Sequence, residues 1–143
     1  MVLTVKGGTK LQKALASELA TFVKDKYLSN YTTLEIEFTI KKNLSEDTGA
    51  DGFCFAVESV RPRTFEIEID KDLSVTKFIK TVIHELVHVR QYAKGELVDY
   101  SRGRAKVSWK GKDYSKTSYS RQPWERQAYR LQESLYNEFM IKE

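Results

Sequence analysis

The sequence predicts a single α+β domain spanning residues 1–143, because two different periodicities alternate along the chain. Three stretches repeat apolar residues every three or four positions, as in a helix with one buried face. Three shorter stretches alternate apolar and polar residues, as in a half-buried strand. The expected helices are residues 9–28, 74–94 and 123–141, and the expected strands are residues 33–41, 53–60 and 64–70. A chain of 143 residues supports one hydrophobic core.

The first half of the chain supplies the first helix and all three expected strands. Thr9 and Gln12 have the spacing of a capping box, which marks the start of the helix. Residues 43–52 form a polar loop between the first two strands, and the turn at residues 61–63 contains a proline. We therefore expect a three-stranded sheet backed by a helix.

The second half begins with the most apolar of the helices, residues 74–94. Ser74 is a suitable cap for its start, and Gly95 is suitable for its end. The basic segment that follows contains a short hairpin that turns at residues 110–112. Pro123, a residue favoured in the first turn of a helix, begins the C-terminal helix.

The composition is that of an ordinary globular protein, with 41% hydrophobic and 31% charged residues. No apolar run approaches the roughly 20 residues of a membrane span, and the N-terminal segment lacks a signal-peptide core. Cys54 is the only cysteine, so no intrachain disulfide forms and a reducing cytoplasm is the expected compartment. We expect a monomer without membrane contact. The net charge of +4 permits contact with nucleic acid or acidic surfaces but does not require it.

The second helix contains the segment HELVH, residues 84–88, which includes both histidines of the chain. His84 and His88 share one helix face, with Cβ atoms roughly 5–6 Å apart, so their ring nitrogens can bind one metal ion. Glu85 is turned about 100° round the helix and suits a general base that acts on a metal-bound water. This is the HExxH pattern of zinc peptidases.

A catalytic zinc site needs a third protein ligand and an open position for water. No histidine remains, and Cys54 lies on an expected strand, so a carboxylate is the expected ligand. The downstream candidates are Glu96, Asp99, Asp113, Glu125, Glu133 and Glu138. Glu125 fits best because it lies in the first turn of an amphipathic helix beside Trp124, while Ala128 leaves room for another helix.

Two motifs, TVIHELVHVRQY and PWERQAY, resemble those of the minimal zincin peptidases, namely SprT-like proteins and the small single-domain gluzincins called minigluzincins. The resemblance covers residues 52–131. It implies a zincin-like minimal metallopeptidase domain that binds one Zn²⁺ per chain through His84, His88 and Glu125, with Glu85 as the base. It also implies hydrolysis of a peptide or protein substrate.

The same resemblance implies that the strand before the HExxH helix pairs with an extended substrate at the edge of the sheet. The expected substrate-binding residues are Phe65, Glu66, Ile67 and Glu68, through their backbone. Peptide hydrolysis also requires a hydrogen-bond donor to the oxyanion. Tyr119 and Tyr129, the tyrosines nearest Glu125, are the candidates.

Two features of the SprT proteins or of related zincins are absent from this sequence. A single cysteine excludes the zinc ribbon of SprT proteins, and no third histidine follows the motif as it does in metzincins. The DNA-repair role of some SprT relatives therefore has no matching motif here.

A nucleic-acid-binding module is the alternative from a different class of function. Basic residues interleaved with aromatic residues favour contacts with single strands, and residues 102–116 have this composition. The candidate residues are Arg104, Lys106, Trp109, Lys110 and Lys112. In this alternative, the zinc site is structural or degenerate.

The segment DTGAD, residues 47–51, resembles the active-site signature of retroviral aspartic proteases. In those proteins an apolar strand precedes the aspartate, whereas polar residues precede Asp47 here. We interpret the segment as a polar turn.

Overall fold

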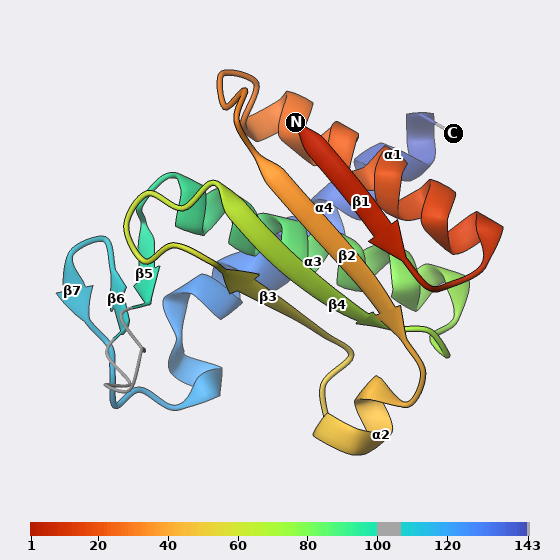
Figure 1. Ribbon diagram of the computed structural model, residues 1–143. Helices are drawn as coiled ribbons and strands as arrows, with labels where there is room; N and C mark the ends of the chain where they lie inside the picture. The colour runs from red at the N-terminus through yellow and green to blue at the C-terminus, as the bar shows by residue number, and fades with distance from the viewer. Residues whose placement is uncertain (100–106, 143) are drawn as a thin grey trace.

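A computed structural model describes residues 1–99 and 107–142 of the chain (Figure 1). Within these residues two sheets and four α-helices are present. In chain order the elements are β1 (Val2–Lys6), α1 (Lys10–Tyr27), β2 (Glu35–Lys41), α2 (Leu44–Thr48), β3 (Gly52–Ala56), β4 (Thr64–Asp70), α3 (Val75–Ala93), β5 (Leu97–Asp99), β6 (Val107–Trp109), β7 (Lys112–Asp113), the 3₁₀ turn η1 (Tyr119–Arg121) and α4 (Pro123–Lys142). The predicted α+β class is confirmed.

The main sheet has four strands in the order β1-β2-β4-β3, rather than the predicted three. Strands β1, β2 and β4 are parallel, and β3 runs antiparallel to β4. The additional strand, β1, is only five residues long and ends at two glycines, Gly7 and Gly8. Five residues are too few for their apolar–polar pattern to distinguish a strand from irregular chain before α1. Pairing with β2 is what makes this segment a strand.

Strand β4 is not an edge strand, which corrects the prediction for residues 64–70. It lies between β2 and β3, so both of its sides are paired. Among the described strands of this sheet, the edges are β1 and β3, and Figure 1 shows β3 on the side next to the small second sheet.

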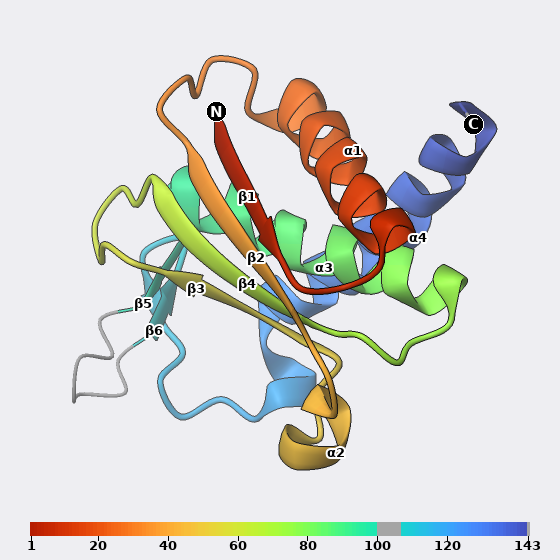
Figure 2. The same ribbon diagram turned by 45° about the vertical axis from the view of Figure 1, so that its right-hand side comes forward.

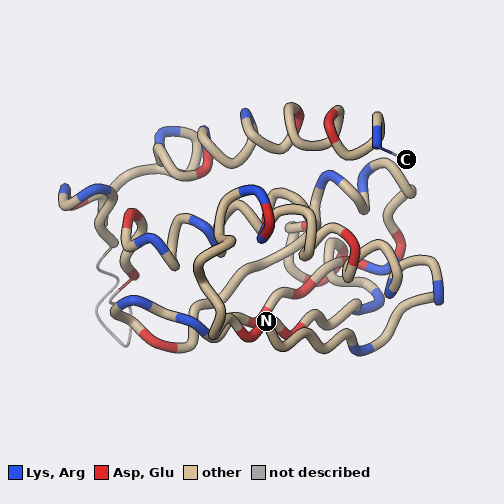
Figure 3. The backbone as a smooth tube through the Cα atoms, turned by 90° about the horizontal axis from the view of Figure 1, so that it is seen from above, with Lys and Arg blue, Asp and Glu red and all other residues tan. Residues whose placement is uncertain are grey.

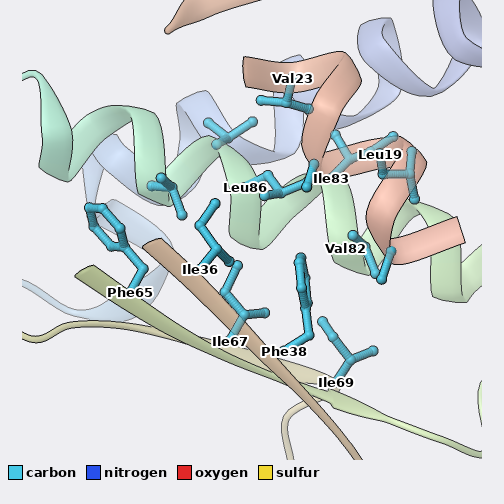
Figure 4. Close-up of a cluster of buried hydrophobic side chains, with 14 of the residues drawn as sticks. Leu19, Val23, Ile36, Phe38, Phe65, Ile67, Ile69, Val82, Ile83 and Leu86 are labelled. Carbon is cyan, nitrogen blue, oxygen red and sulfur yellow. The ribbon is translucent and has the colours of Figure 1, made fainter. Parts of the chain in front are cut away.

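Helices α1, α3 and α4 form two layers on one face of the main sheet. Figures 2 and 3 show α1 and α3 against the sheet and α4 beyond α3. Alternate residues of β2 and β4 face these helices, including Phe38 and Ile67, which are fully buried. Figure 4 shows them pointing toward Leu19 of α1 and Leu86 of α3. The helix that carries the HExxH motif therefore lies in the centre of the core.

Local signals correctly predicted the start of α1 and both ends of α3. Thr9 and Gln12 form both bonds of the capping box of α1, and the Ser74 hydroxyl accepts a hydrogen bond from the Lys77 amide at the start of α3. Gly95 has φ +74° and follows the last turn of α3, as expected of a glycine that ends a helix.

A second, three-stranded sheet in the order β5-β6-β7 follows α3. The predicted hairpin corresponds to β6 and β7, joined through Lys110 and Gly111, which both have positive φ as a two-residue hairpin turn requires. Strand β5 adds to its other side. This sheet carries a separate hydrophobic cluster made of Leu97, Trp109 and Trp124. The start of α4 thus belongs to the small cluster and not to the main core.

Two shorter segments differ from their predictions. Residues 44–48 form the short helix α2 within the expected polar loop, and the second predicted strand ends at Ala56 instead of residue 60. Among the described residues, no helix has the length and apolar character that crossing a membrane requires.

Candidate metal centre

The two histidines lie one turn apart on the face of α3 that is turned toward α4. Their side chains are almost completely buried, with 7% of His84 and 6% of His88 exposed. The two rings meet edge to face with centroids 4.9 Å apart. The predicted convergence of two imidazoles on one point is therefore confirmed, and it follows from the i, i+4 spacing alone.

The third member of the group is Glu125, in the first turn of α4. Its Oε1 atom lies 2.9 Å from His84 Nε2 and 3.2 Å from His88 Nε2. The ligand atoms of the three residues all lie within 4.8 Å of one another, and no other such group of three occurs among residues 1–99 and 107–142. This buried group could hold a metal ion.

Packing on the small sheet positions Glu125. The preceding residue, Trp124, is buried, and its ring lies 6.4 Å from that of Trp109 and 6.0 Å from that of Tyr114. One turn later, Ala128 is fully buried between α4 and α3. A larger residue there would push the helices apart and withdraw Glu125 from the histidines.

Two glutamines that the sequence did not predict as site residues complete the histidine contacts. Gln91 Oε1 lies 2.7 Å from His88 Nδ1, and Gln132 Oε1 lies 3.0 Å from His84 Nδ1. A carbonyl oxygen only accepts hydrogen bonds, so each Nδ1 carries a proton. The Nε2 atoms face the Glu125 carboxylate, and each would present a lone pair to a metal ion that displaces the Nε2 proton. The sequence signal for Gln91 was an amide three residues after His88, on the same face of the helix.

The electrostatics of the group favour a bound cation. Burial opposes ionisation of Glu125, but hydrogen bonds from His84 and His88 outweigh it and hold the pKa of Glu125 well below its usual range. Burial alone would lower the pKa of His88, but the hydrogen bond and charge of Glu125, with the charge of Glu85, raise it. The centre thus has an ionised carboxylate and an imidazole stabilised in its positive form, and a cation can replace that proton.

Glu85 lies beside this group without belonging to it. Only 5% of the residue is exposed, and burial raises its pKa despite the opposing effect of the two histidines. Gly52 of β3 makes room for it, because a Cβ atom there would lie 2.9 Å from Thr81 Cγ2 and 3.1 Å from Glu85 Oε2. The close approach of β3 and α3 therefore depends on glycine at this position.

Both candidate tyrosines lie at the site. The Tyr119 hydroxyl donates to Glu125 Oε1 at 3.1 Å and lies 3.3 Å from the Tyr129 hydroxyl. The Tyr129 ring packs on His84 at 4.5 Å between centroids. Burial, together with the bond to Tyr129, raises the pKa of Tyr119, so its hydroxyl remains a donor at neutral pH.

A cleft of about 840 Å³ contains the metal group and Glu85 and has β3 as one wall. The register of β3 shows which backbone groups face the unpaired edge. Val57 and Thr64 are a hydrogen-bonded pair, as are Asp51 and Asp70, so the alternation of an antiparallel ladder turns the N–H and C=O groups of the even-numbered residues 52, 54 and 56 outward.

The four residues predicted for substrate binding therefore do not form the edge of the cleft. Phe65 and Ile67 are buried in the core, and Glu66 and Glu68 project from the opposite face of the central strand. The prediction identified the strand adjacent to the motif in sequence, whereas the adjacent edge in space is β3.

The predicted nucleic-acid residues do not form an open stacking surface in the described part of the chain. Trp109 is 8% exposed and packs in the small cluster. Lys110 lies 4.0 Å from Glu96, and Lys112 lies over the Tyr114 ring. The aromatic side chain that the alternative would use is thus already packed against the domain, whereas the two lysines are exposed.

Two more predicted nucleic-acid residues, Arg104 and Lys106, lie outside the described residues. Asp47, from the DTGAD segment, is an exposed residue of the short helix α2. The segment was interpreted as a polar turn, and it is polar and exposed at Asp47, but Asp47 and Thr48 belong to a helix, which corrects that interpretation.

Comparison with protein-family models, with curated proteins and with solved structures gave no match to this chain.

Proposed function

We propose that this chain is a zinc-dependent peptidase. The supporting observation is the buried group of His84, His88 and Glu125 with a separate carboxylate, Glu85, beside it. Two nitrogen ligands and one oxygen ligand with an open position suit catalytic zinc. Non-haem iron oxygenases use the same donor types, but the additional buried carboxylate favours hydrolysis, which needs a base. The HExxH and PWExxA motifs favour the same function.

The residues around the group have distinct roles in this proposal. Zinc, when bound, supplies a Lewis acid that polarises a water molecule and the carbonyl of the scissile bond. Glu85 accepts a proton from the water as the oxygen attacks the carbonyl carbon, and it donates that proton to the amine as the carbon–nitrogen bond breaks. Its raised pKa suits both transfers. The hydroxyls of Tyr119 and Tyr129 are the available donors for the negative charge on the carbonyl oxygen.

The substrate in this proposal is an extended peptide that pairs with β3. The outward N–H and C=O groups of residues 52, 54 and 56 supply the edge for strand addition, and Gly52 places that edge against Glu85. Main-chain pairing would hold the peptide along the cleft without selecting its side chains.

The test of catalysis is Glu85→Gln. We expect hydrolysis of an unfolded protein such as casein to fall roughly 10²–10⁴-fold, because the base is lost, while bound zinc measured by elemental analysis stays at one per chain. Glu133→Gln is the matched control, since Glu133 lines the same cleft but pairs with Lys80. Zinc loss in Glu85→Gln, or wild-type turnover, would contradict the assigned role.

The test of the substrate edge is Ala56→Pro, which removes an outward amide and leaves the β3–β4 ladder intact. We expect peptide binding to the inactive Glu85→Gln chain to weaken about three- to tenfold, the effect of one lost hydrogen bond. Glu66→Ala, on the open face of β4, serves as the control. Equal binding by both variants would place the peptide elsewhere.

A further inference from the structure

Gln91 is a completely buried amide, with 0% of its surface exposed, on the face of α3 that meets α4. Its side-chain oxygen and its NH₂ group all have hydrogen-bond partners. Its Oε1 atom faces His88 Nδ1 at 2.7 Å, and its Nε2 atom donates to the Trp124 carbonyl at 2.9 Å and to Gln127 Oε1 at 2.8 Å. Two of these partners lie on the other helix, within two residues of Glu125.

The orientation of this amide follows from its partners. The Trp124 carbonyl can only accept a hydrogen bond, so the NH₂ group of Gln91 must face α4 and the oxygen must face His88. The imidazole then has to donate from Nδ1, so Nε2, which faces Glu125, is the nitrogen that gives up its proton when a metal binds. A backbone carbonyl on α4 thus determines, through one side chain, which nitrogen of a histidine on α3 is available to a metal.

We propose that Gln91 is the positioning residue that couples the two halves of the metal centre, and this proposal rests on the proposed metal site. It selects the tautomer of His88 and ties the peptide that precedes Glu125 to the same helix turn. Gln132 makes the corresponding contact to His84, but within the described residues its NH₂ group bonds only to Glu133, its exposed neighbour on the same helix. Gln91 therefore holds two ligands together, whereas Gln132 orients one.

The experiment compares zinc and cobalt binding by the wild-type chain, Gln91→Met, Gln132→Met and Ile67→Val. We expect Gln91→Met to weaken zinc binding about 10- to 100-fold in competition with a chromogenic chelator. Gln132→Met should have a smaller effect. Ile67→Val, a conservative change in the sheet core, controls for lost stability and should bind zinc like the wild type.

Two spectroscopic measurements separate positioning from mere folding. The visible spectrum of bound Co²⁺ reports ligand geometry, and ¹⁵N spectra of the imidazoles report the tautomer. We expect Gln91→Met to change the cobalt spectrum and to populate both tautomers of His88. Gln91→Glu keeps the acceptor for His88 but loses the donors to α4, so it should retain the tautomer and still bind zinc more weakly. If Gln91→Met does not fold, Gln91→Glu still tests the proposal.

Zinc affinity within twofold of the wild type in both Gln91 variants would overturn the proposal, as would an equal loss in Ile67→Val. Absence of metal binding by the wild-type chain would overturn the metal centre and this inference together. None of these measurements involves peptide hydrolysis. A chain that binds zinc but cleaves no peptide would refute the peptidase and would leave the role of Gln91 to be decided by the same affinities.

Discussion

The two helices that supply the metal group are held by different parts of the molecule. Helix α3 lies between the main sheet and α4, and most of its residues from Phe78 to Ala93 are buried. Helix α4 buries only four residues along its length, and the one next to Glu125 packs on the small β5–β7 sheet. From Ala128 onward α4 also joins the main core, so the difference lies in its first turn, which carries Glu125 and packs on the small sheet.

This difference indicates where the centre is most easily disturbed. The histidines are held chiefly by the main core, because α3 contacts α1, β3, β4 and α4, and it contacts the small sheet only through β5 among the described strands. Glu125 can shift if the three-residue cluster around Trp124 loosens or if the contacts of Gln91 are lost. Variants in the main core should therefore change the stability of the whole domain, whereas variants in the small cluster should change metal affinity first.

The largest effect is expected from Leu86→Ala in the main core, where the wild-type side chain is 2% exposed. The cavity should lower the free energy of unfolding by about 2–5 kcal/mol, measured by urea denaturation of the metal-free protein. Metal affinity of the folded fraction should stay near that of the wild type. A large affinity loss without a stability loss would break the proposed division between the two regions.

The loss of stability at low pH should also arise in the main sheet and its core. Asp70 is buried at the end of β4, and although burial opposes ionisation, bonds from Ser45 and from the Asp72 amide lower its pKa. A lowered pKa stabilises the fold fully above the unfolded value of about 3.9, and this contribution disappears as pH falls through the folded value.

The corresponding variant is Asp70→Asn. It should cost about 2 kcal/mol at pH 7, as expected for hydrogen bonds to a charged group, and the difference from the wild type should shrink below about pH 4. Urea denaturation at several pH values measures this. A difference that is constant with pH would mean that the charge of Asp70 contributes nothing.

Glu125→Ala tests the ligand that α4 supplies. We expect zinc affinity to fall at least about tenfold, roughly 1.4 kcal/mol, in competition with a chromogenic chelator. Glu133→Ala, two turns further along the same helix, should bind zinc like the wild type. Equal affinity in the two variants would remove Glu125 from the ligand set.

The smallest effect, and the most informative for the comparison, is expected from Trp109→Leu in the small cluster. Trp109 contacts no ligand, but its ring supports Trp124. Zinc affinity should fall about threefold, or roughly 0.7 kcal/mol, with little change in the urea midpoint of the metal-free protein. If stability falls as much as in Leu86→Ala, the small cluster and the main core are one cooperative unit.

Features that depend on neighbouring residues could be predicted from the sequence. The capping box of Thr9 and the cap at Ser74 join residues three positions apart, and the two histidines converge because a helix brings i and i+4 together. The carboxylate of Glu125 could be ranked first among six candidates, because its helix had an apolar face and a tryptophan beside it. The distances between Glu125 and the two histidines could not be predicted from the sequence.

The sequence by itself thus determined the three long helices, the caps of α1 and α3 and the histidine pair, because the interactions that form them are local. Tertiary structure alone decided that β1 is a strand, that β3 and not β4 borders the cleft, and that Gln91 bridges the two helices. These features join segments that are distant in sequence. A strand's position in a sheet depends on which partner buries its faces, and a buried amide's partners depend on how two helices pack. Neither is encoded in the periodicity of the segment itself.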